Sequence, residues 1–182
     1  MQTVYVFLAN GFEDIEAIST IDVLRRGGLN VLTVSINDTL QVTSAHNVCI
    51  NADVLFDDAD FSEAQLLVLP GGLPGADNLK AHDGLRQVLT AHAAAGRHIG
   101  AICAAPIVLG NACLLDGKKA TCYPGFEDAL GEACHVAEGV VTDGNITTAM
   151  GPAFSLPFAY RLLEQLTDTD TAQQVQLGML YV

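Results

Sequence analysis

The chain has few basic side chains. Eight lysines and arginines stand against 21 aspartates and glutamates among its 182 residues, and the formal net charge is −13. A protein that binds nucleic acid neutralises phosphates with lysine and arginine. We therefore expect no nucleic-acid partner, and the acidity mainly favours solubility.

Long hydrophobic runs are also missing. No apolar run reaches the roughly 18 residues that a membrane-spanning helix needs, although half of the residues are hydrophobic. No basic segment precedes the first apolar run, so we expect no signal peptide. No repeat, linker or low-complexity stretch is visible. The sequence predicts one domain over residues 1–182, with a sizeable core and a cytoplasmic location.

The five cysteines are odd in number and widely spaced. Neither a disulfide framework nor a C-x-x-C metal site is visible, so we expect no metal site. The simplest interpretation is a set of reduced thiols in a cytosolic protein. Four of them are expected to fill space in the core: Cys49, Cys113, Cys122 and Cys134.

Apolar strands alternate with helices along most of the chain. This order predicts an α/β sandwich in which helices cover both faces of a mostly parallel sheet. The predicted strands are Thr3–Ala9, Asn30–Ile36, Gln65–Leu69, His98–Ile102 and Lys118–Tyr123, with hairpins at Leu40–Ile50 and Val136–Ala149. The predicted helices run from the acidic residues near Glu13 to Arg26, over Gly84–Ala95, from about Pro106, and over Ala153–Leu166 and Thr171–Leu180.

Three segments follow strands at the edge where such folds bind ligands. They are Gly11–Glu16, Gly71–Gly75 and Cys103–Pro106. The third is the most informative, because an apolar strand runs directly into Cys103 and a helix of small residues begins at once. Such an elbow aims a side chain over the sheet edge, and the helix start favours a thiolate.

Each candidate residue also has a plain structural interpretation. Cys103 is either a nucleophile or a buried small residue. The backbone N–H groups of Gly71, Gly72 and Ala104 either stabilise an oxyanion or belong to ordinary turns. Glu16 is either a solvated carboxylate at a helix start or a partly desolvated acid beside the elbow. In the second case its pKa rises, and it can exchange a proton with a thiol or a substrate.

The other polar candidates are weaker. Glu13 and Asp14 are predicted to be solvated carboxylates at a helix start, and Asp77-Asn78 to cap the next helix. His82 and His92 are expected to be solvated, while His98 opens its strand at the wrong end of the sheet. His46 lies in a hairpin that could reach the site of a partner subunit. No spacing specifies a protease-like triad of cysteine, histidine and aspartate.

Three ordered motifs together resemble the ThiJ/PfpI superfamily. Within it, the chain looks closest to the branch of the Parkinson disease protein deglycase and its bacterial homologues, over nearly its whole length. The motifs are Gly11-Phe12-Glu13-Asp14-Ile15-Glu16, Leu69-Pro70-Gly71-Gly72 and Ala101-Ile102-Cys103-Ala104-Ala105-Pro106. Two later segments agree with them, Thr121-Cys122-Tyr123-Pro124-Gly125 and Thr148-Ala149-Met150-Gly151-Pro152.

The resemblance implies a flavodoxin-like sandwich that forms homodimers through its first helix and the neighbouring hairpin. It implies an oxidation-sensitive nucleophile at Cys103, an acidic partner at Glu16 and an oxyanion hole at Gly72 and Ala104. Glyoxalase and deglycase activities without an external cofactor belong to this family, with small carbonyl metabolites or glycated side chains as substrates. The expected lining of the site is Gly71, Leu73, Tyr123, Pro124 and His46.

Three departures from the family pattern bear on the activity. Ala104 stands where protease-like members carry histidine, which argues against proteolysis. Tyr123 replaces a histidine of the Parkinson-related protein, and a phenol with a pKa of about 10 is a poor base at neutral pH. Met150 replaces an arginine and removes an anion contact. Two functions remain open, a glyoxalase or deglycase and a non-catalytic redox sensor or chaperone-like protein that uses the same cysteine.

Overall fold

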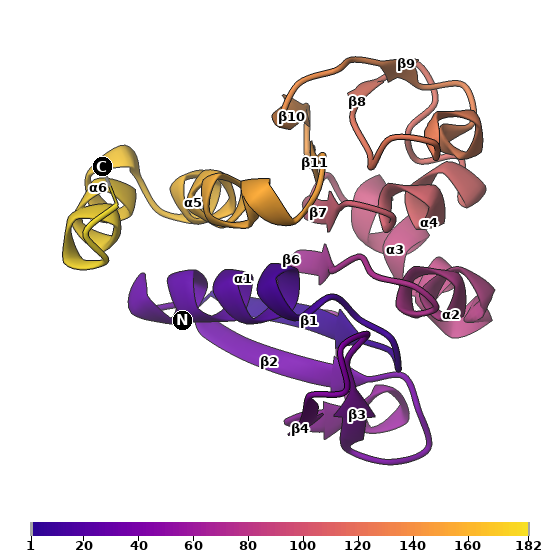
Figure 1. Ribbon diagram of the computed structural model, residues 1–182, viewed down its shortest axis with the longest axis horizontal. Helices are drawn as coiled ribbons and strands as arrows, with labels where there is room; N and C mark the ends of the chain where they lie inside the picture. Colours follow the sequence, from indigo (N-terminus) through magenta and orange to yellow (C-terminus); the bar gives the residue numbers. More distant parts are fainter. Residues whose placement is uncertain (1, 182) are drawn as a thin grey trace.

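Seven strands form one mostly parallel sheet in the computed structural model, which describes residues 2–181 (Figure 1). All neighbouring strands run parallel except the edge strand β10, which pairs antiparallel with β11. The predicted α/β class is therefore confirmed. In spatial order the strands are β10 (Val140–Asp143), β11 (Ile146–Ala149), β7 (His98–Ile102), β6 (Ala64–Leu69), β1 (Thr3–Leu8), β2 (Asn30–Ser35) and β5 (Val54–Leu55).

Helices cover both faces of this sheet (Figure 1). On one face α1 (Asp14–Arg26) packs against α5 (Ser155–Leu166), and α6 (Thr169–Gly178) packs against α5. The other face carries α2 (Gly75–Ala81), α3 (Asp83–Ala94) and α4 (Pro106–Asn111). Two short pairs lie outside the sheet, β3 (Gln41–Thr43) with β4 (Cys49–Asn51), and β8 (Lys119–Ala120) with β9 (Cys134–His135). Three 3₁₀ turns complete the chain, at Phe56–Asp58, Glu127–Leu130 and Pro152–Phe154.

The central strand β1 explains why two layers of helices are needed. Its side chains alternate between the faces, as strand geometry dictates. Val4, Val6 and Leu8 belong to the core under α1 and α5. Tyr5 and Phe7 belong to the core under α2, α3 and α4. Since both faces of the strand are apolar, each has to be covered.

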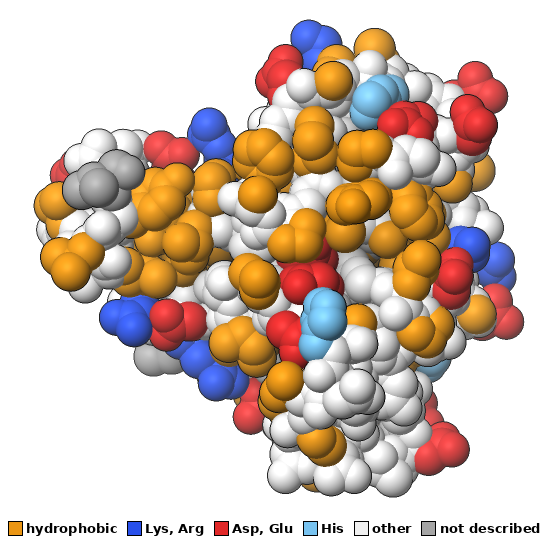
Figure 2. Space-filling model, viewed as in Figure 1, with side chains coloured by type: hydrophobic (Ala, Val, Ile, Leu, Met, Phe, Trp, Pro, Cys, Tyr) orange, Lys and Arg blue, Asp and Glu red, His pale blue; other side chains and the backbone are white. Residues whose placement is uncertain are grey.

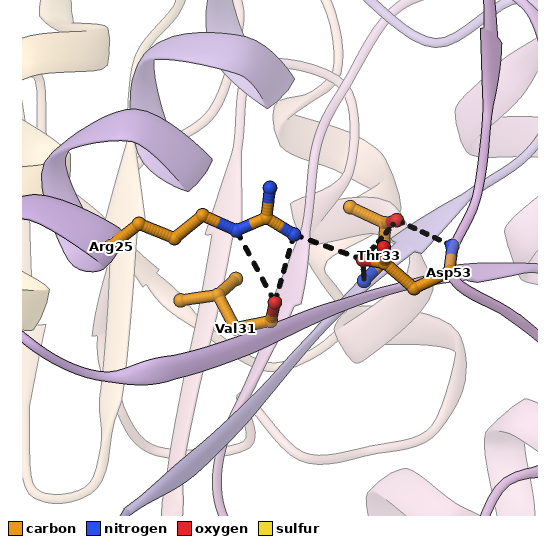
Figure 3. A network of polar contacts seen from close by, with 4 residues as sticks. All are labelled: Arg25, Val31, Thr33 and Asp53. Atoms are coloured by element: carbon orange, nitrogen blue, oxygen red, sulfur yellow. Dashed lines mark hydrogen bonds and ion pairs between the residues drawn. The ribbon is translucent and has the colours of Figure 1, made fainter.

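A polar network fixes the end of α1 against the sheet (Figure 3). The Arg25 guanidinium donates to the Val31 carbonyl at 2.9 Å and pairs with the Asp53 carboxylate at 2.9 Å. The same carboxylate accepts from the backbone N–H and the hydroxyl of Thr33, both at 2.8 Å. The network therefore joins α1, β2 and the segment that leads into β5. It orients α1, whose first turn carries Glu16.

The order of the strands places the candidate segments together. From β1 the chain passes to β2 on one side, whereas β6 pairs with β1 on the other side. The chain thus leaves the carboxyl ends of β1 and β6 toward opposite faces, which creates a crevice between them. The segments after β1, β6 and β7 meet at this edge of the sheet.

Most predicted elements are present, with shifted ends, but two predictions are wrong and one helix was missed. The strand predicted over Lys118–Tyr123 is only the short β8, outside the main sheet. Beyond it, the Tyr123 N–H donates to the Cys103 carbonyl at 2.8 Å instead of to a strand. Asp77 and Asn78 lie inside α2, which was not predicted. His82 caps α3 instead, since its ring nitrogen accepts from the Leu85 N–H.

Two predictions about burial also need correction. His92, a residue of α3, is only 5% exposed, and its ring Nε2 is hydrogen-bonded to the His98 carbonyl. All five cysteines are free, but Cys49, Cys113 and Cys134 are exposed, so of the four expected core fillers only Cys122 is buried. Among residues 2–181, no helix combines the length and the hydrophobicity that crossing a bilayer requires.

Candidate active site

Cys103 stands at a strained elbow between β7 and α4. Its φ of +65° lies in the left-handed region, which residues other than glycine rarely adopt. Two hydrogen bonds hold this conformation: the Cys103 N–H donates to the Ala149 carbonyl, and the Cys103 carbonyl accepts from the Tyr123 N–H, both at 2.8 Å. The residue is 7% exposed. The backbone conformation therefore sets the direction of the Cys103 side chain.

Glu16 is the acidic side chain beside this sulfur. It projects from the first turn of α1 and is fully buried. One carboxylate oxygen, Oε2, accepts from the Gly71 N–H at 2.8 Å, and the side chain lies close enough to the Cys103 thiol for the two groups to shift each other's pKa. The interpretation of Glu16 as a solvated helix-start carboxylate is therefore wrong, and the desolvated alternative is confirmed.

The two groups compete for protons. Burial raises the pKa of Glu16 from 4.5 to about 7, against the hydrogen bonds from Cys103 and Gly71. Burial and the negative charge of Glu16 raise the pKa of the Cys103 thiol from 9.0 to about 12, against the N–H groups of Gly72 and Ala104. The expectation that the elbow alone favours a thiolate is thus wrong for the resting site. Above pH 7 the pair holds one proton, so a thiolate forms when Glu16 takes that proton.

Glycines make room for this contact. A Cβ on Gly71 would lie 2.7 Å from the Cys103 Cβ and 2.8 Å from the Glu16 carboxylate. Gly72 has a φ of +85°, and a Cβ there would lie 2.5 Å from the Glu13 nitrogen. The backbone N–H groups of Gly72 and Ala104 lie close enough to the sulfur to lower the pKa of the Cys103 thiol. Gly71 can therefore lie against Cys103 and Glu16 only because it has no side chain.

A second acidic cluster braces the start of α1. Glu13 is 8% exposed and caps the helix by accepting from the Glu16 N–H at 2.8 Å. Asp14 accepts from the Ser44 hydroxyl at 2.5 Å and bonds the His46 ring at 2.6 Å. The expectation that Glu13 and Asp14 are solvated is therefore wrong.

Donor atoms of Glu13, Asp14 and His46 lie within 4.8 Å of one another, a spacing that a cation could use. Each of the three side chains is already hydrogen-bonded within the protein. The cluster therefore ties α1 to the turn between β3 and β4.

The remaining predicted lining residues lie at the rim. Leu73 and Tyr123 are 48% and 46% exposed, and Pro124 is exposed as well. Gly151 lies against the Tyr123 ring, since a Cβ on Gly151 would lie 3.2 Å from the ring edge. His46 bonds Asp14 and not Cys103. Among the residues that the structure describes, no histidine is hydrogen-bonded to Cys103.

Sequence reasoning missed the capping role of Glu13 and the contact between Asp14 and His46. The spacing Glu13-x-x-Glu16 resembles a capping box, which could have indicated the cap. Nothing local could have indicated the other contact, because Asp14 and His46 are 32 positions apart.

Comparisons with known proteins agree on the family and the fold. The model of the DJ-1/PfpI family matches residues 2–165. Protein DJ-1 homolog A of Arabidopsis thaliana is 40% identical over 182 residues. The match covers 98% of this chain but only 46% of that protein, so the chain spans less than half of the relative's length. The Parkinson disease protein 7 homolog of Danio rerio is 32% identical, with 96% of this chain and 95% of that protein covered. The structure of oxidized Toxoplasma gondii DJ-1 superposes with a TM-score of 0.96 at 36% identity, with both chains fully covered.

Proposed function

Because the chain belongs to the DJ-1/PfpI family, we propose that it is a stress-protective glyoxalase or deglycase that depends on Cys103. Its substrates are reactive dicarbonyls, or their early adducts with protein amines and nucleotides. The observation that carries the proposal is the buried contact between the Cys103 thiol and Glu16, with two backbone N–H groups aimed at the sulfur. This chemistry needs a nucleophile, a proton carrier and an oxyanion site, and no cofactor takes part in it.

The first step forms a bond between sulfur and carbon. Glu16 accepts the thiol proton, and the Cys103 thiolate adds to the aldehyde carbon of the dicarbonyl. The carbonyl electron pair moves to its oxygen, which takes over the N–H groups of Gly72 and Ala104. Glu16 then returns the proton to this oxygen, and a hemithioacetal results. A carboxyl group with a pKa of about 7 is suited to both transfers at neutral pH.

The second step moves one proton between neighbouring carbons. The Glu16 carboxylate removes the hydrogen from the carbon that carries sulfur and delivers it to the adjacent carbonyl carbon, while the hydroxyl proton of the first carbon passes to the oxygen of the second. The product is a thioester of a 2-hydroxy acid. Water hydrolyses the thioester, so dicarbonyl plus water becomes hydroxy acid and the thiol is restored. With a hemiaminal adduct, the same attack expels the amine, which leaves with a proton from Glu16.

The test is the conversion of methylglyoxal by purified protein. We expect Cys103→Ala and Glu16→Gln to fall to the background rate, because each removes one half of the pair. Cys122→Ala is the matched control, since Cys122 is also buried but belongs to another core. A wild-type rate no higher than that of Cys103→Ala would refute the proposal.

The redox alternative rests on a different observation. The second oxygen of the Glu16 carboxylate, Oε1, is buried without a hydrogen-bond partner. An oxidised sulfur could supply that partner, and one relative was solved in an oxidised form. In this case peroxide transfers oxygen to the thiolate while water leaves, and the sulfur stops at sulfenate or sulfinate. Intact mass after mild peroxide favours this function if Cys103 alone gains oxygen in a protein that shows no turnover.

We also infer that the chain forms homodimers in a reducing compartment such as the cytoplasm. Apolar side chains gather on the face that carries α1 and α5 (Figure 2). Ile15 and Ile18 of α1 are 55% and 46% exposed, and Val48 of the adjoining turn is 52% exposed. Adjacent exposed apolar residues of this kind commonly mark contacts between proteins. The five free cysteines fit a reducing environment.

A further inference from the structure

An apolar groove lies beside the two segments that are hydrogen-bonded to the Cys103 backbone. It has a volume of about 240 Å³, enough for a short alkyl group or a phenyl ring. Each of its two walls starts at, or next to, a residue that is hydrogen-bonded to the Cys103 backbone. Tyr123 donates its N–H to the Cys103 carbonyl, and Met150 directly follows Ala149, which accepts the Cys103 N–H. The lining residues are Tyr123, Pro124, Met150, Gly151, Pro152, Ala153 and Phe154.

The aromatic walls of this groove are held in place. The Phe154 ring lies over Gly139, where a Cβ would come within 2.1 Å of the ring. The Tyr123 ring lies against Gly151 and makes an edge contact with Phe126, with ring centres 6.4 Å apart. Tyr123 carries the one polar side-chain atom among the seven lining residues. A ligand group in the groove therefore meets mainly carbon.

No lysine or arginine reaches this region among residues 2–181. Arg97 is hydrogen-bonded to backbone carbonyls at the amino-terminal end of the sheet, and Lys118 and Lys119 adjoin the turn between β10 and β11. The remaining five are engaged in ion pairs with carboxylates, namely Arg25, Arg26, Lys80, Arg86 and Arg161.

The charged groups that face Cys103 are acidic. Glu16 touches the sulfur, and Glu13 lies close enough to raise the pKa of Glu16. The one nearby group that can become cationic, the exposed His46 ring, is paired with Asp14. An anionic ligand would therefore meet negative charge at the sulfur and find no basic partner in the groove.

We propose that this groove takes the apolar side group of a neutral α-oxoaldehyde, and that the site selects neutral carbonyl compounds over anionic ones. This inference names the substrate class and rests on the proposed function. Met150 is the specificity-determining residue, because it occupies a groove wall one position after Ala149. A positive charge at this position would lie beside the entering ligand.

The first experiment compares kcat/KM for phenylglyoxal and for 4,5-dioxopentanoate, an α-oxoaldehyde that carries a carboxylate. We expect phenylglyoxal to be preferred by about tenfold or more, the effect of one unfavourable charge in a partly buried site. Met150→Arg should reduce this preference by about tenfold. Gln173→Arg is the matched control, because it adds the same charge on the exposed surface of α6 and should leave the ratio unchanged. Equal or better turnover of the carboxylate compound by the wild-type protein would overturn the inference and leave the proposed function standing.

The second experiment separates the two proposals, because it needs no turnover. Cys103 is alkylated with iodoacetamide, N-benzyl iodoacetamide or iodoacetate, and each rate is divided by the rate of glutathione with the same reagent. We expect N-benzyl iodoacetamide to react fastest and iodoacetate slowest, and Met150→Arg to accelerate iodoacetate selectively. This order in a protein without glyoxalase activity would support the groove and refute the proposed function. The absence of any such order would overturn the inference.

Discussion

Replacing Glu16 with glutamine should make the protein more stable at pH 8, although it removes a proposed catalytic group. Burial raises the pKa of this carboxyl from 4.5 to about 7, so the folded protein binds the proton more tightly than the unfolded chain does. The stability that this proton provides is complete below pH 4.5 and is lost as the pH rises through about 7. Glutamine is neutral at every pH and avoids the loss.

The size of the effect follows from the two pKa values. Each tenfold change in proton affinity is worth about 1.4 kcal/mol, so a rise from 4.5 to about 7 corresponds to roughly 3 kcal/mol. For a chain of this length, that is about 6 to 12 °C in melting temperature. The free energy of unfolding of Glu16→Gln minus that of the wild type should therefore rise by roughly 3 kcal/mol between pH 4.5 and pH 8.

Urea unfolding at a series of pH values, with a reductant present, measures this difference. Asp22→Asn is the matched control, since Asp22 is an exposed carboxylate on the same helix. Subtracting the wild type removes the titration of the groups that both proteins share. A difference that stays flat across this range would refute the reasoning, because Glu16 would then be hydrated or paired in the folded protein.

Three further perturbations test other parts of the structure. Gly71→Ala places a methyl group against Cys103 and Glu16, so we expect a loss of about 1 to 3 kcal/mol in urea unfolding and slower alkylation of Cys103. Gly178→Ala, which meets open space, should do neither, and an equal loss there would contradict the crowding argument. Burial lowers the pKa of His92, so the wild type should lose stability relative to His92→Gln as the pH falls below about 6.5. A difference in unfolding free energy that stays constant between pH 5 and 8 would show that His92 is not desolvated. Ile18→Glu should convert the proposed dimer to monomer in sedimentation, whereas Leu177→Glu on α6 should not, and a dimer that persists in Ile18→Glu would place the interface elsewhere.

The sheet and the site segments could be predicted because their signals are local. An apolar strand that runs into Cys103, with Pro106 at the next helix start, specifies an elbow within ten residues. The short β8 could not be predicted, since the Thr121 N–H donates to the Thr148 side chain and the Tyr123 N–H to the Cys103 carbonyl, and neither joins the backbone ladder of a strand. Those partners are distant in sequence.

The direction of the pKa shift was predicted for Glu16 but not for the Cys103 thiol. Reasoning from the helix start considered the N–H groups that lower the pKa of the Cys103 thiol. It did not weigh the charge of Glu16, which acts in the opposite direction together with burial. The balance depends on how closely the two side chains approach and how well water is excluded, and both are properties of the assembled fold. The burial of His92 escaped prediction for the same reason.

The two hydrogen bonds of the Cys103 backbone have a consequence for motion. The amide of Cys103 is bonded to β11 and the amide of Tyr123 to Cys103, so we expect both amides to exchange slowly with solvent. The Cys103 sulfur is therefore carried by hydrogen-bonded backbone at the end of a core strand. Motion near the elbow falls instead to the exposed side chain of Leu73 at the rim, which can change rotamer within nanoseconds while the elbow keeps its shape.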